Sequence, residues 1–596
     1  MIDGAAYYQA VREALRAAQE RVVILGWDLH SQTPLVGETG EPDDGLPRLF
    51  GDFIVALESQ RPRLEIYLLA WDFAAVFAMD RELFPRLRFG WSMPSRIHFR
   101  LDGSVPLGSS HHQKLVVIDD AVAFCGGLDL TIRRWDTARH RTDEPLRVDP
   151  DGEPYPPFHD VQMLVDGAAA RALGELANER WATACGEDMT RPNGEDEQAH
   201  DPWPQSVSPD FKDVRVGIAR TSPHYDGRPE VCEVEQLYLD SIEAAEQSIY
   251  IENQFLTFDP FAKGVAQRLR ARCELEVLIV APEKAESWIE YHSMRAGRIV
   301  FTRELMRHDD ERVRLLYPEV SLNGSHTSTM VHAKVMIVDD RLLRVGSANL
   351  NNRSMAADTE CDLVIEASCE ADREAIRAVR ARLIADHCGV PAERAAEEIA
   401  LRGSLILAAE TLSGHGHRLR PIDDGELDTA EISAYLQLVA DPHDPIGVET
   451  VNDLFRSQLS NTQLSALTKL ALVVLVLAVL TLVWQLTPLA EFANVQEVRE
   501  TIASYSRSWF GGPLVIGLFV LAGLVSFPVT ILIAATAAAF GPWPGIAYAG
   551  AGALASAIVT FAIGALLGRE MLRGLLGPRL ERAHQRIARS GVPAVA

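Results

Sequence analysis

Two segments of the chain repeat one pattern of chemically active residues. Each has a histidine, a lysine two positions later and an aspartate five positions after the lysine. The histidines lie 220 residues apart, and the members of the two patterns are His112, Lys114 and Asp119, and His332, Lys334 and Asp339. Four apolar residues follow each lysine, which is typical of a strand buried on both faces. The repeat predicts two matched strands, each presenting a histidine and a lysine.

These residue types fit the chemistry of a phosphodiester. Residues two apart on an extended strand point to one side, so each histidine shares a face with its lysine. One neutral imidazole can attack phosphorus and form a phosphohistidine, while a second, protonated imidazole donates to the leaving oxygen and then activates water or an alcohol. Histidine's ordinary pKa of about 6.5 makes this unequal protonation accessible. Each half of a duplicated fold would supply one ring, so we expect the site between the halves.

Cationic and polar groups would stabilise the charge that develops on the phosphate oxygens. Only six of the 57 basic residues are lysines, so two lysines at one offset from a histidine are a specific choice. A lysine ammonium grips a phosphate oxygen as a point charge. We expect Ser347 and Asn349, which follow the second motif, to contact the phosphate as well. This chemistry requires neither a metal ion nor an organic cofactor.

Helical and strand patterns alternate through the N-terminal two thirds of the chain. The strand RVVILGW follows a helix expected over Ala6–Glu20, and SIYIENQFL follows a helix expected over Val234–Gln247. Such alternation predicts an α/β architecture with helices covering a sheet. A segment rich in Pro, Gly and Asp, Thr190–Asp213, has the composition of a linker or long loop.

Charge and cysteine content exclude several classes of protein. The formal net charge is −26 and residues 461–596 contribute +4, so the first 460 residues carry −30. Nucleic-acid-binding surfaces are basic, and we therefore expect no nucleic-acid partner. The seven cysteines are scattered without Cys-X-X-Cys spacing, which argues against a metal cluster or a disulfide framework and favours a reducing compartment. The N-terminal residues lack the pattern of a signal peptide.

Two long uncharged stretches lie near the C-terminus. Residues 470–490 suit one membrane-spanning helix of about 20 residues. Residues 508–568 are also uncharged, but Pro528, Pro542, Pro544 and many glycines interrupt them, which predicts either two to three short spans or a re-entrant pair with one span. Six arginines lie within 569–589, whereas the loop 491–507 has a net charge of −1. The positive-inside rule therefore predicts a cytoplasmic tail and a cytoplasmic N-terminal part.

At the paired motifs the sequence resembles the phospholipase D superfamily, whose signature is two such motifs in one chain. Three segments resemble its phospholipid-acting branch: His111–Asp136, Tyr250–Thr257 and Gly346–Glu360. The resemblance implies an α/β domain of two lobes related by pseudo-twofold symmetry. We expect the first lobe over residues 1–200, the second over 201–395, and a helical or loop connector over 396–463.

The resemblance also implies roles for the motif residues. His112 would be the nucleophile and His332 the general acid and base, with the reverse order remaining open. The motif lysines and Asn349 would contact the phosphate. In this family a downstream carboxylate orients each catalytic ring, which implies Asp160 for His112 and Glu360 for His332.

The remaining motif residues, Asp119 and Asp339, are expected to support the strand turns and the lobe interface rather than to carry protons.

Further along the chain, Phe527–Arg569 is similar to the SNARE-associated (DedA/VTT-like) membrane family. This similarity implies a partial membrane domain over 508–596, which would follow the transmembrane helix that the uncharged stretch predicts over 464–490. We therefore expect a multi-pass protein of the cytoplasmic (inner) membrane, with its catalytic part on the cytoplasmic side.

Together these features predict a phospholipase D-type phosphodiesterase. It would cleave a phospholipid at the bilayer into phosphatidic acid and a headgroup alcohol, through a phosphohistidine. One alternative is a phosphatidyltransferase similar to cardiolipin synthase, with a lipid alcohol in place of water. Two others are a phosphodiesterase acting on nucleic acid, which conflicts with the acidic charge, and a lipid-handling protein whose catalytic part is only a scaffold.

Overall fold

The computed structural model divides into two units that follow one another along the chain. Residues 1–446 form one compact unit and residues 447–596 a second. The residues described are 1–72, 93–106, 108–191, 201–284, 288–307, 311–322, 324–414, 416–425, 440–445, 511–524 and short pieces between 536 and 556.

Most of the C-terminal part lies outside the described residues, including the helix expected over 464–490. Of the domain expected over 508–596, the structure describes α16 (Gly511–Leu524) and short helical pieces up to residue 556. In the segments for which a structure is given, we find no helix with both the length and the apolar character needed to cross a bilayer.

The first lobe is built on a six-stranded mixed sheet with the order β3-β2-β1-β4-β5-β7. Strands β1, β2 and β3 are parallel, and β4, β5 and β7 each run antiparallel to the preceding neighbour. The strands are β1 (Arg21–Gly26), β2 (Glu65–Trp71), β3 (Ile97–Asp102), β4 (Leu115–Ile118), β5 (Val122–Gly126) and β7 (Gln162–Asp166).

The second lobe repeats this arrangement strand for strand. Its sheet has the central order β12-β11-β10-β15-β16-β17, with the same three parallel strands followed by three antiparallel ones. The strands are β10 (Ser248–Asn253), β11 (Glu276–Val280), β12 (Val313–Leu322), β15 (Lys334–Val338), β16 (Leu342–Gly346) and β17 (Glu360–Glu366). The matching order confirms the duplicated α/β architecture.

Extra strands extend the second sheet at both edges. Strands β8 (Val216–Ser222) and β9 (Val231–Cys232) continue from β17, while β13 (Ser325–Ser328) and β18 (His417–Pro421) pair with β12. The second lobe therefore extends beyond its expected boundary at residue 395, because β18 completes its sheet.

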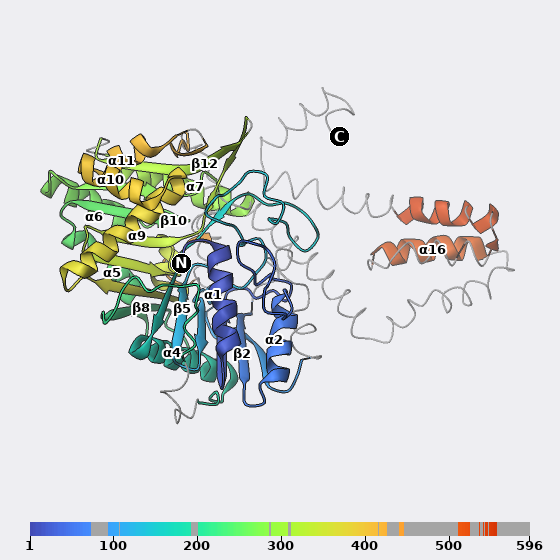
Figure 1. The fold of residues 1–596 in the computed structure, drawn as a ribbon. Helices are drawn as coiled ribbons and strands as arrows, with labels where there is room; N and C mark the ends of the chain where they lie inside the picture. The colour runs from blue at the N-terminus through green and yellow to red at the C-terminus, as the bar shows by residue number, and fades with distance from the viewer. Residues whose placement is uncertain are drawn as a thin grey trace, which may run out of the picture. The chain divides into compact units, whose positions relative to one another are not determined.

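Helices cover both faces of each sheet (Figure 1). Alternate side chains of β1 enter different cores: Val22 and Ile24 pack in the core that contains α1 (Gly4–Ala17) and α2 (Phe50–Gln60), and the intervening residues pack with α4 (Gly167–Cys185). The helices of the second lobe are α5 (Glu233–Ala244), α6 (Asp259–Ala271), α7 (Trp288–Leu305), α8 (Asn352–Ala356), α9 (Glu370–Cys388), α10 (Ala392–Arg402) and α11 (Leu405–Leu412).

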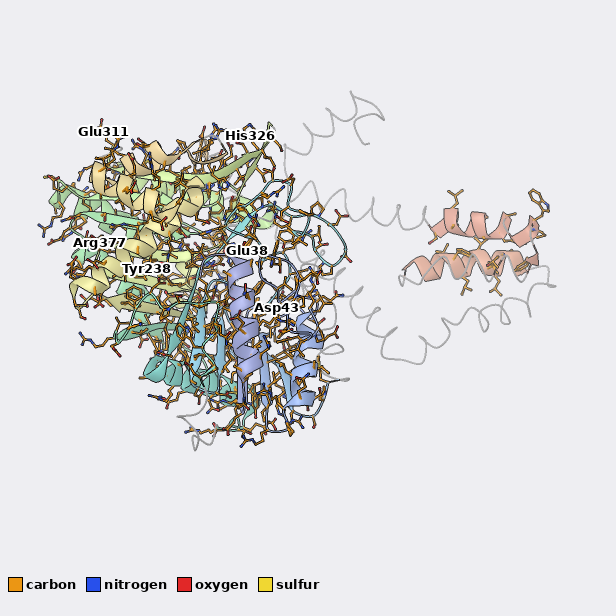
Figure 2. The ribbon with its side chains drawn as sticks, in the orientation of Figure 1. Glu38, Asp43, Tyr238, Glu311, His326 and Arg377 are labelled. Carbon is orange, nitrogen blue, oxygen red and sulfur yellow. The ribbon has the colours of Figure 1, made fainter. Side chains whose placement is uncertain are left out.

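The segment expected to be a connector contributes to the second core. Leu405 and Leu412 of α11 and Leu419 of β18 pack in one apolar cluster with residues of α9 and β15. Burial of apolar side chains on this scale makes these elements part of the lobe. Exposed acidic residues such as Glu38, Asp43 and Glu311 lie at the surface of this N-terminal unit (Figure 2).

Candidate active site

The two motif histidines lie where the lobes exchange backbone hydrogen bonds. Each histidine comes just before its strand, β4 or β15. The amide of His112 donates to the carbonyl of Thr359 at 3.0 Å, and the amide of His332 donates to the carbonyl of His159 at 2.8 Å. Beside the second contact, β14 (Met330–Val331) pairs in parallel with β6 (Phe158–His159). Each histidine is thus anchored to the opposite lobe.

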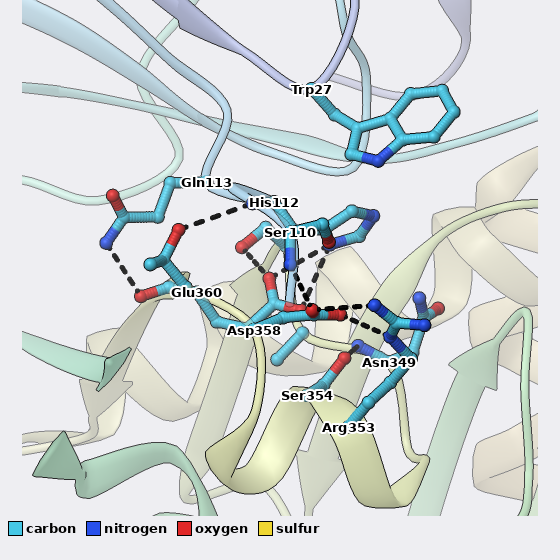
Figure 3. Close-up of polar contacts among 12 residues, drawn as sticks. Trp27, Ser110, His112, Gln113, Asn349, Arg353, Ser354, Asp358 and Glu360 are labelled. Atoms are coloured by element: carbon cyan, nitrogen blue, oxygen red, sulfur yellow. Dashed lines mark hydrogen bonds and ion pairs between the residues drawn. The ribbon is translucent and has the colours of Figure 1, made fainter. Parts of the chain in front are cut away.

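A second anchor holds the first motif against the other lobe. The amide of Ser110 donates to the carboxylate of Asp358 at 2.7 Å. Arg353 donates to both oxygens of that carboxylate, at 2.6 and 2.9 Å (Figure 3). The sequence alone does not predict this bidentate pair, because its role depends on the contact between residue 358 and residue 110 of the other lobe. It fixes the segment that precedes His112.

The carboxylates that orient the rings are crossed between the lobes. His112 Nδ1 lies 3.0 Å from both oxygens of Glu360 (Figure 3). His332 Nδ1 lies 2.7 Å from Asp160 Oδ2. The expected pairing of Asp160 with His112 and of Glu360 with His332 is therefore wrong. The four residues are the expected ones, but each ring takes its carboxylate from the other half.

The crossing follows from the position of the carboxylates in the sheets. Asp160 lies two residues before β7 and Glu360 is the first residue of β17, and these are the outermost strands of the duplicated six-strand pattern. Residues from β17 pack in one apolar cluster with β4, β5 and α4 of the first lobe. A carboxylate at this edge therefore faces the partner lobe rather than its own motif strand.

A small residue lies next to each of the two ring-orienting carboxylates, and its contact differs with the length of the carboxylate side chain. A Cβ atom on Gly127 would lie 2.3 Å from Asp160 Oδ1, so this position accepts only glycine without displacement of the carboxylate. The equivalent residue, Ser347, donates its hydroxyl to Glu360 Oε2 at 2.5 Å and is fully buried. Ser347 was expected to contact the phosphate. It instead positions the longer carboxylate, because its hydroxyl is already engaged within the protein.

Both lysines lie beside the histidines, as their spacing indicates. Lys114 Nζ lies 2.9 Å from Asp129 Oδ2. Lys334 Nζ donates to Gln254 Oε1 at 3.2 Å and to the carbonyl of His332. Both lysines are at least nine-tenths buried, so their charges act with little screening by water.

Asn349 occupies in the second lobe the place that Asp129 has in the first. It is 4% exposed, and its Oδ1 atom has no hydrogen-bond partner among the described residues. Oδ1 only accepts hydrogen bonds, so a phosphate contact would have to come from the amide nitrogen, and this contact stays a prediction. Asp129 was missed as a partner of Lys114, although the repeat aligned it with Asn349.

Burial and nearby cations favour the neutral form of both imidazoles. Burial lowers the pKa of His112 well below its usual range, and Lys114 and Lys334 lower it further. Burial also lowers the pKa of His332, with added effects from Lys334 and Arg134. Their side chains are 16% and 10% exposed, respectively, so both rings keep limited access to solvent. Neutral rings suit a nucleophile, and a bound phosphate anion would favour protonation of one of them.

The surrounding groups share this perturbed environment. Burial lowers the pKa of Lys334 to about 7. Burial raises the pKa of Asp160 to about 6 and raises that of Glu360 above its usual range. Perturbed acids and bases gathered in one place are typical of a catalytic site.

The motif aspartates lie at the other ends of the motif strands. Asp119 accepts hydrogen bonds from the amides of residues 19, 20 and 21 at 2.7–2.9 Å. Asp339 accepts from the amides of residues 246, 247 and 248. Both have a left-handed backbone, with φ of 51° and 52°, in the turn after β4 or β15. They support the strand turns as expected, but each contacts its own lobe rather than the lobe interface.

Two protein-family models match the part of the chain that builds this site. Residues 98–259 match the family described as "Phospholipase D", and residues 238–383 match "Cardiolipin synthase, PLD-like domain". The α/β unit therefore carries phospholipase D-superfamily domains within residues 98–383.

Individual proteins are similar to this chain over part of its length. The chain is 25% identical to phospholipase D A of Dictyostelium discoideum over 435 residues, covering 61% of this chain and 32% of that protein. It is 23% identical to phospholipase D alpha 1 of Vigna unguiculata over 489 residues, covering 59% of each. A solved structure, phosphatidylserine synthase of Haemophilus influenzae Rd KW20, is 14% identical with a TM-score of 0.41, covering 62% of this chain and 83% of that one. The chain thus spans about a third to three fifths of the length of these curated relatives.

Proposed function

We propose that the chain is a phospholipase D-type phosphodiesterase that releases a headgroup alcohol and phosphatidic acid. The observation that carries this proposal is the pair of crossed histidine–carboxylate contacts between duplicated lobes. Each carboxylate accepts the Nδ1 proton and so leaves Nε2 of the ring free for chemistry. Two such rings, with two buried lysines beside them, form a set that phosphoryl transfer through histidine requires.

The reaction divides into two displacements. His112 Nε2 attacks phosphorus, and the bond from phosphorus to the headgroup oxygen breaks as protonated His332 donates a proton to that oxygen. Neutral His332 then takes a proton from water, which attacks the phosphohistidine and releases phosphatidic acid. Lys114 and Lys334 stabilise the negative charge on the non-bridging oxygens in both steps. The reverse assignment of the two histidines gives the same products.

We further propose that the C-terminal part holds this unit at a bilayer. The support is the sequence, in which 470–490 and 508–568 are uncharged. A tethered site meets phospholipid already concentrated at the membrane surface. The arginines that follow residue 568 favour the cytoplasmic (inner) leaflet as the location of the tether.

The direct test uses the full chain in detergent with vesicles of several phospholipids, and identifies products by mass spectrometry. We expect phosphatidic acid to form and to carry one 18O atom when the reaction runs in 18O-labelled water. His112→Ala and His332→Ala should each lower kcat/KM by at least about 10^2-fold, because each removes a proton carrier or nucleophile. His326→Ala, at an exposed position outside the site, is the matched control. Full turnover in either active-site variant would refute the proposal.

A second candidate function is phosphatidyl transfer to a lipid alcohol. It is favoured by the match of residues 238–383 to the cardiolipin synthase model. With phosphatidylglycerol as the lipid, hydrolysis gives labelled phosphatidic acid and glycerol. Transfer gives cardiolipin and glycerol without incorporation of the label. The ratio of the two products separates the candidates, and both require the same two histidines.

A further inference from the structure

A second cluster of titratable side chains is buried behind the histidine pair. It consists of Asp3, His140, His159 and Asp386, which are between 0% and 8% exposed. The four come from the segment before α1, a loop, β6 and α9, so the cluster joins the first lobe to the second. The mechanism above uses none of them.

The nitrogen and oxygen atoms of the cluster have the separations of a metal coordination shell. His140 Nε2 lies 3.5 Å from Asp3 Oδ2 and 3.1 Å from Asp386 Oδ2. His159 Nδ1 lies 2.9 Å from Asp3 Oδ1 and 3.2 Å from Asp386 Oδ2. Bonds of about 2.0–2.1 Å in a tetrahedral zinc site place ligand atoms roughly 3.3–3.4 Å apart. The observed distances lie close to this value.

Hydrogen bonding leaves several polar atoms of the cluster without a partner among the residues that the structure describes. Both oxygens of Asp3, Nδ1 of His159 and Oδ1 of Asp386 have no hydrogen-bond partner within the described part of the chain. His159 Nδ1 comes within 2.9 Å of Asp3 Oδ1 as an ion pair. One hydrogen bond does lie within the cluster, between His140 Nε2 and Asp386 Oδ2 at 3.1 Å. A cation bound to a ring nitrogen lies along the lone-pair axis of that nitrogen. Its other ligands, here the carboxylate oxygens, then lie to the side of that axis, as they do for His159.

The outer contacts of both rings prepare their inner nitrogens to bind a cation. His140 Nδ1 lies 2.9 Å from Asp136 Oδ2, and His159 Nε2 lies 2.9 Å from Glu252 Oε2. A carboxylate on one ring nitrogen fixes the proton there and leaves a lone pair on the other, which is how metal-binding histidines are oriented. With a cation bound, both lone pairs would face Asp3 and Asp386, whose buried negative charges favour a positive partner. Without a cation, a proton on His140 Nε2 makes the hydrogen bond to Asp386.

The backbone supports the same arrangement. Asp3 has φ of 67° and His140 has φ of 40°, both in a region that L-residues rarely adopt. Two of the four residues therefore hold their side chains in the cluster against a local conformational preference. Strain of this kind persists only where the surroundings fix it.

We propose that Asp3, His140, His159 and Asp386 bind one divalent transition-metal cation of the zinc type. Two imidazoles and two carboxylates suit such a cation, whereas calcium and magnesium prefer oxygen ligands throughout. The cation cross-links four segments of both lobes. It also steadies the orienting carboxylate Asp160, which follows His159 directly and whose carbonyl accepts a hydrogen bond from the amide of Asp3 at 2.8 Å. The cation has a structural role and does not depend on the proposed lipid activity.

Metal content is the first measurement. The full chain is produced with zinc in the medium, purified without chelator and analysed by elemental mass spectrometry. We expect about one zinc per chain, together with a loss of stability on chelation that added Zn2+ reverses. Replacement by Co2+ should give the ligand-field absorption of a tetrahedral site. Less than about a tenth of an equivalent of any transition metal, with no change in Tm on adding Zn2+, would overturn the proposal.

Variants then assign the ligands. His140→Gln and Asp386→Asn should each lose bound zinc and the Tm increase on adding Zn2+. His98→Gln, whose ring pairs with Glu65 elsewhere in the first lobe, is the matched control and should retain both. Stoichiometric zinc in the His140→Gln, Asp386→Asn double variant would overturn the assignment, as would stabilisation by Ca2+ or Mg2+ alone. If a variant fails to fold, the metal content and Co2+ spectrum of the unmodified chain still decide the proposal.

Discussion

At the scale of single residues, each lobe depends on the other for the tautomer and orientation of its catalytic histidine ring. Glu360 is fully buried, accepts from Ser347 and lies 3.0 Å from Nδ1 of His112, so it fixes the tautomer of a ring in the other lobe. Asp160 does the same for His332. Neither lobe could orient its catalytic histidine alone, so the chemistry requires both halves of the duplicated fold.

A double-mutant cycle tests the crossed contacts. Glu360→Gln should lower kcat/KM by about 10–10^3-fold, because the amide no longer stabilises a charged His112 ring. His112→Ala and Glu360→Gln should be strongly non-additive, as expected for contacting residues. His112→Ala and Asp160→Asn report on different rings and serve as the comparison pair. Stronger coupling of His112 to Asp160 than to Glu360 would contradict the geometry.

The lowered pKa values of the two histidines predict an acidic optimum. The free enzyme is active when one ring is neutral and the other protonated, and this form is most abundant midway between the two pKa values. Both values lie below 6.5 because of burial and the lysines. We therefore expect kcat/KM for a soluble short-chain phospholipid to peak below pH 6.5 and to fall as the pH rises, since the acid histidine loses its proton. An optimum above pH 7.5 for kcat/KM would be inconsistent with these shifts.

At the scale of elements, each motif aspartate joins two strands at a turn. Asp339 ends β15 in a left-handed conformation and binds the amides that lead into β10, its antiparallel neighbour. Asp119 repeats this between β4 and β1. The aspartate of each motif is therefore part of the support that places the histidine at the opposite end of the strand.

Removal of this support should cost stability rather than chemistry. We expect Asp339→Ala to lower the free energy of unfolding by about 1–3 kcal/mol, because amides at the strand entry lose their acceptor. Asp339→Asn should cost less, since asparagine tolerates the left-handed backbone and keeps one acceptor oxygen. Denaturant unfolding with Glu311→Ala as a surface control measures the difference. A loss of kcat in the folded Ala variant as large as that of His332→Ala would show a direct catalytic role instead.

At the scale of the whole molecule, the chemistry and the membrane-like sequence fall in different units. Both motifs and both orienting carboxylates lie within residues 1–446, which form one compact unit. The uncharged stretches lie within residues 447–596. This division predicts that cleavage and membrane attachment can be separated.

A chain that ends at Ile446 tests that separation. We expect it to cleave a monomeric short-chain phospholipid with kcat/KM within about threefold of the full chain, since every group that handles the phosphate is retained. It should remain in the supernatant with phosphatidylcholine vesicles, whereas the full chain sediments with them. Equal sedimentation of the two chains would assign membrane binding to the N-terminal unit.

The sequence alone determined the duplicated α/β fold and the histidines, lysines and carboxylates of the motifs, but not Asp129 or the Arg353–Asp358 pair. The period of the apolar strands and the spacing of histidine, lysine and aspartate are local properties, so they could be read along the chain. The offset of 220 residues between the motifs also relates Asp129 to Asn349, but only Asn349 was recognised as a candidate.

The tertiary structure decided which of these residues meet. Residues 112 and 160 are nearer in sequence than residues 112 and 360, but the outer strand of each lobe faces the partner lobe, so the carboxylates cross. Ser347 turned out to hold Glu360, and Asp3, His140, His159 and Asp386 came together from four distant segments. Sequence spacing carries no information on such contacts, because the docking of two lobes, rather than any local preference, brings their atoms within reach.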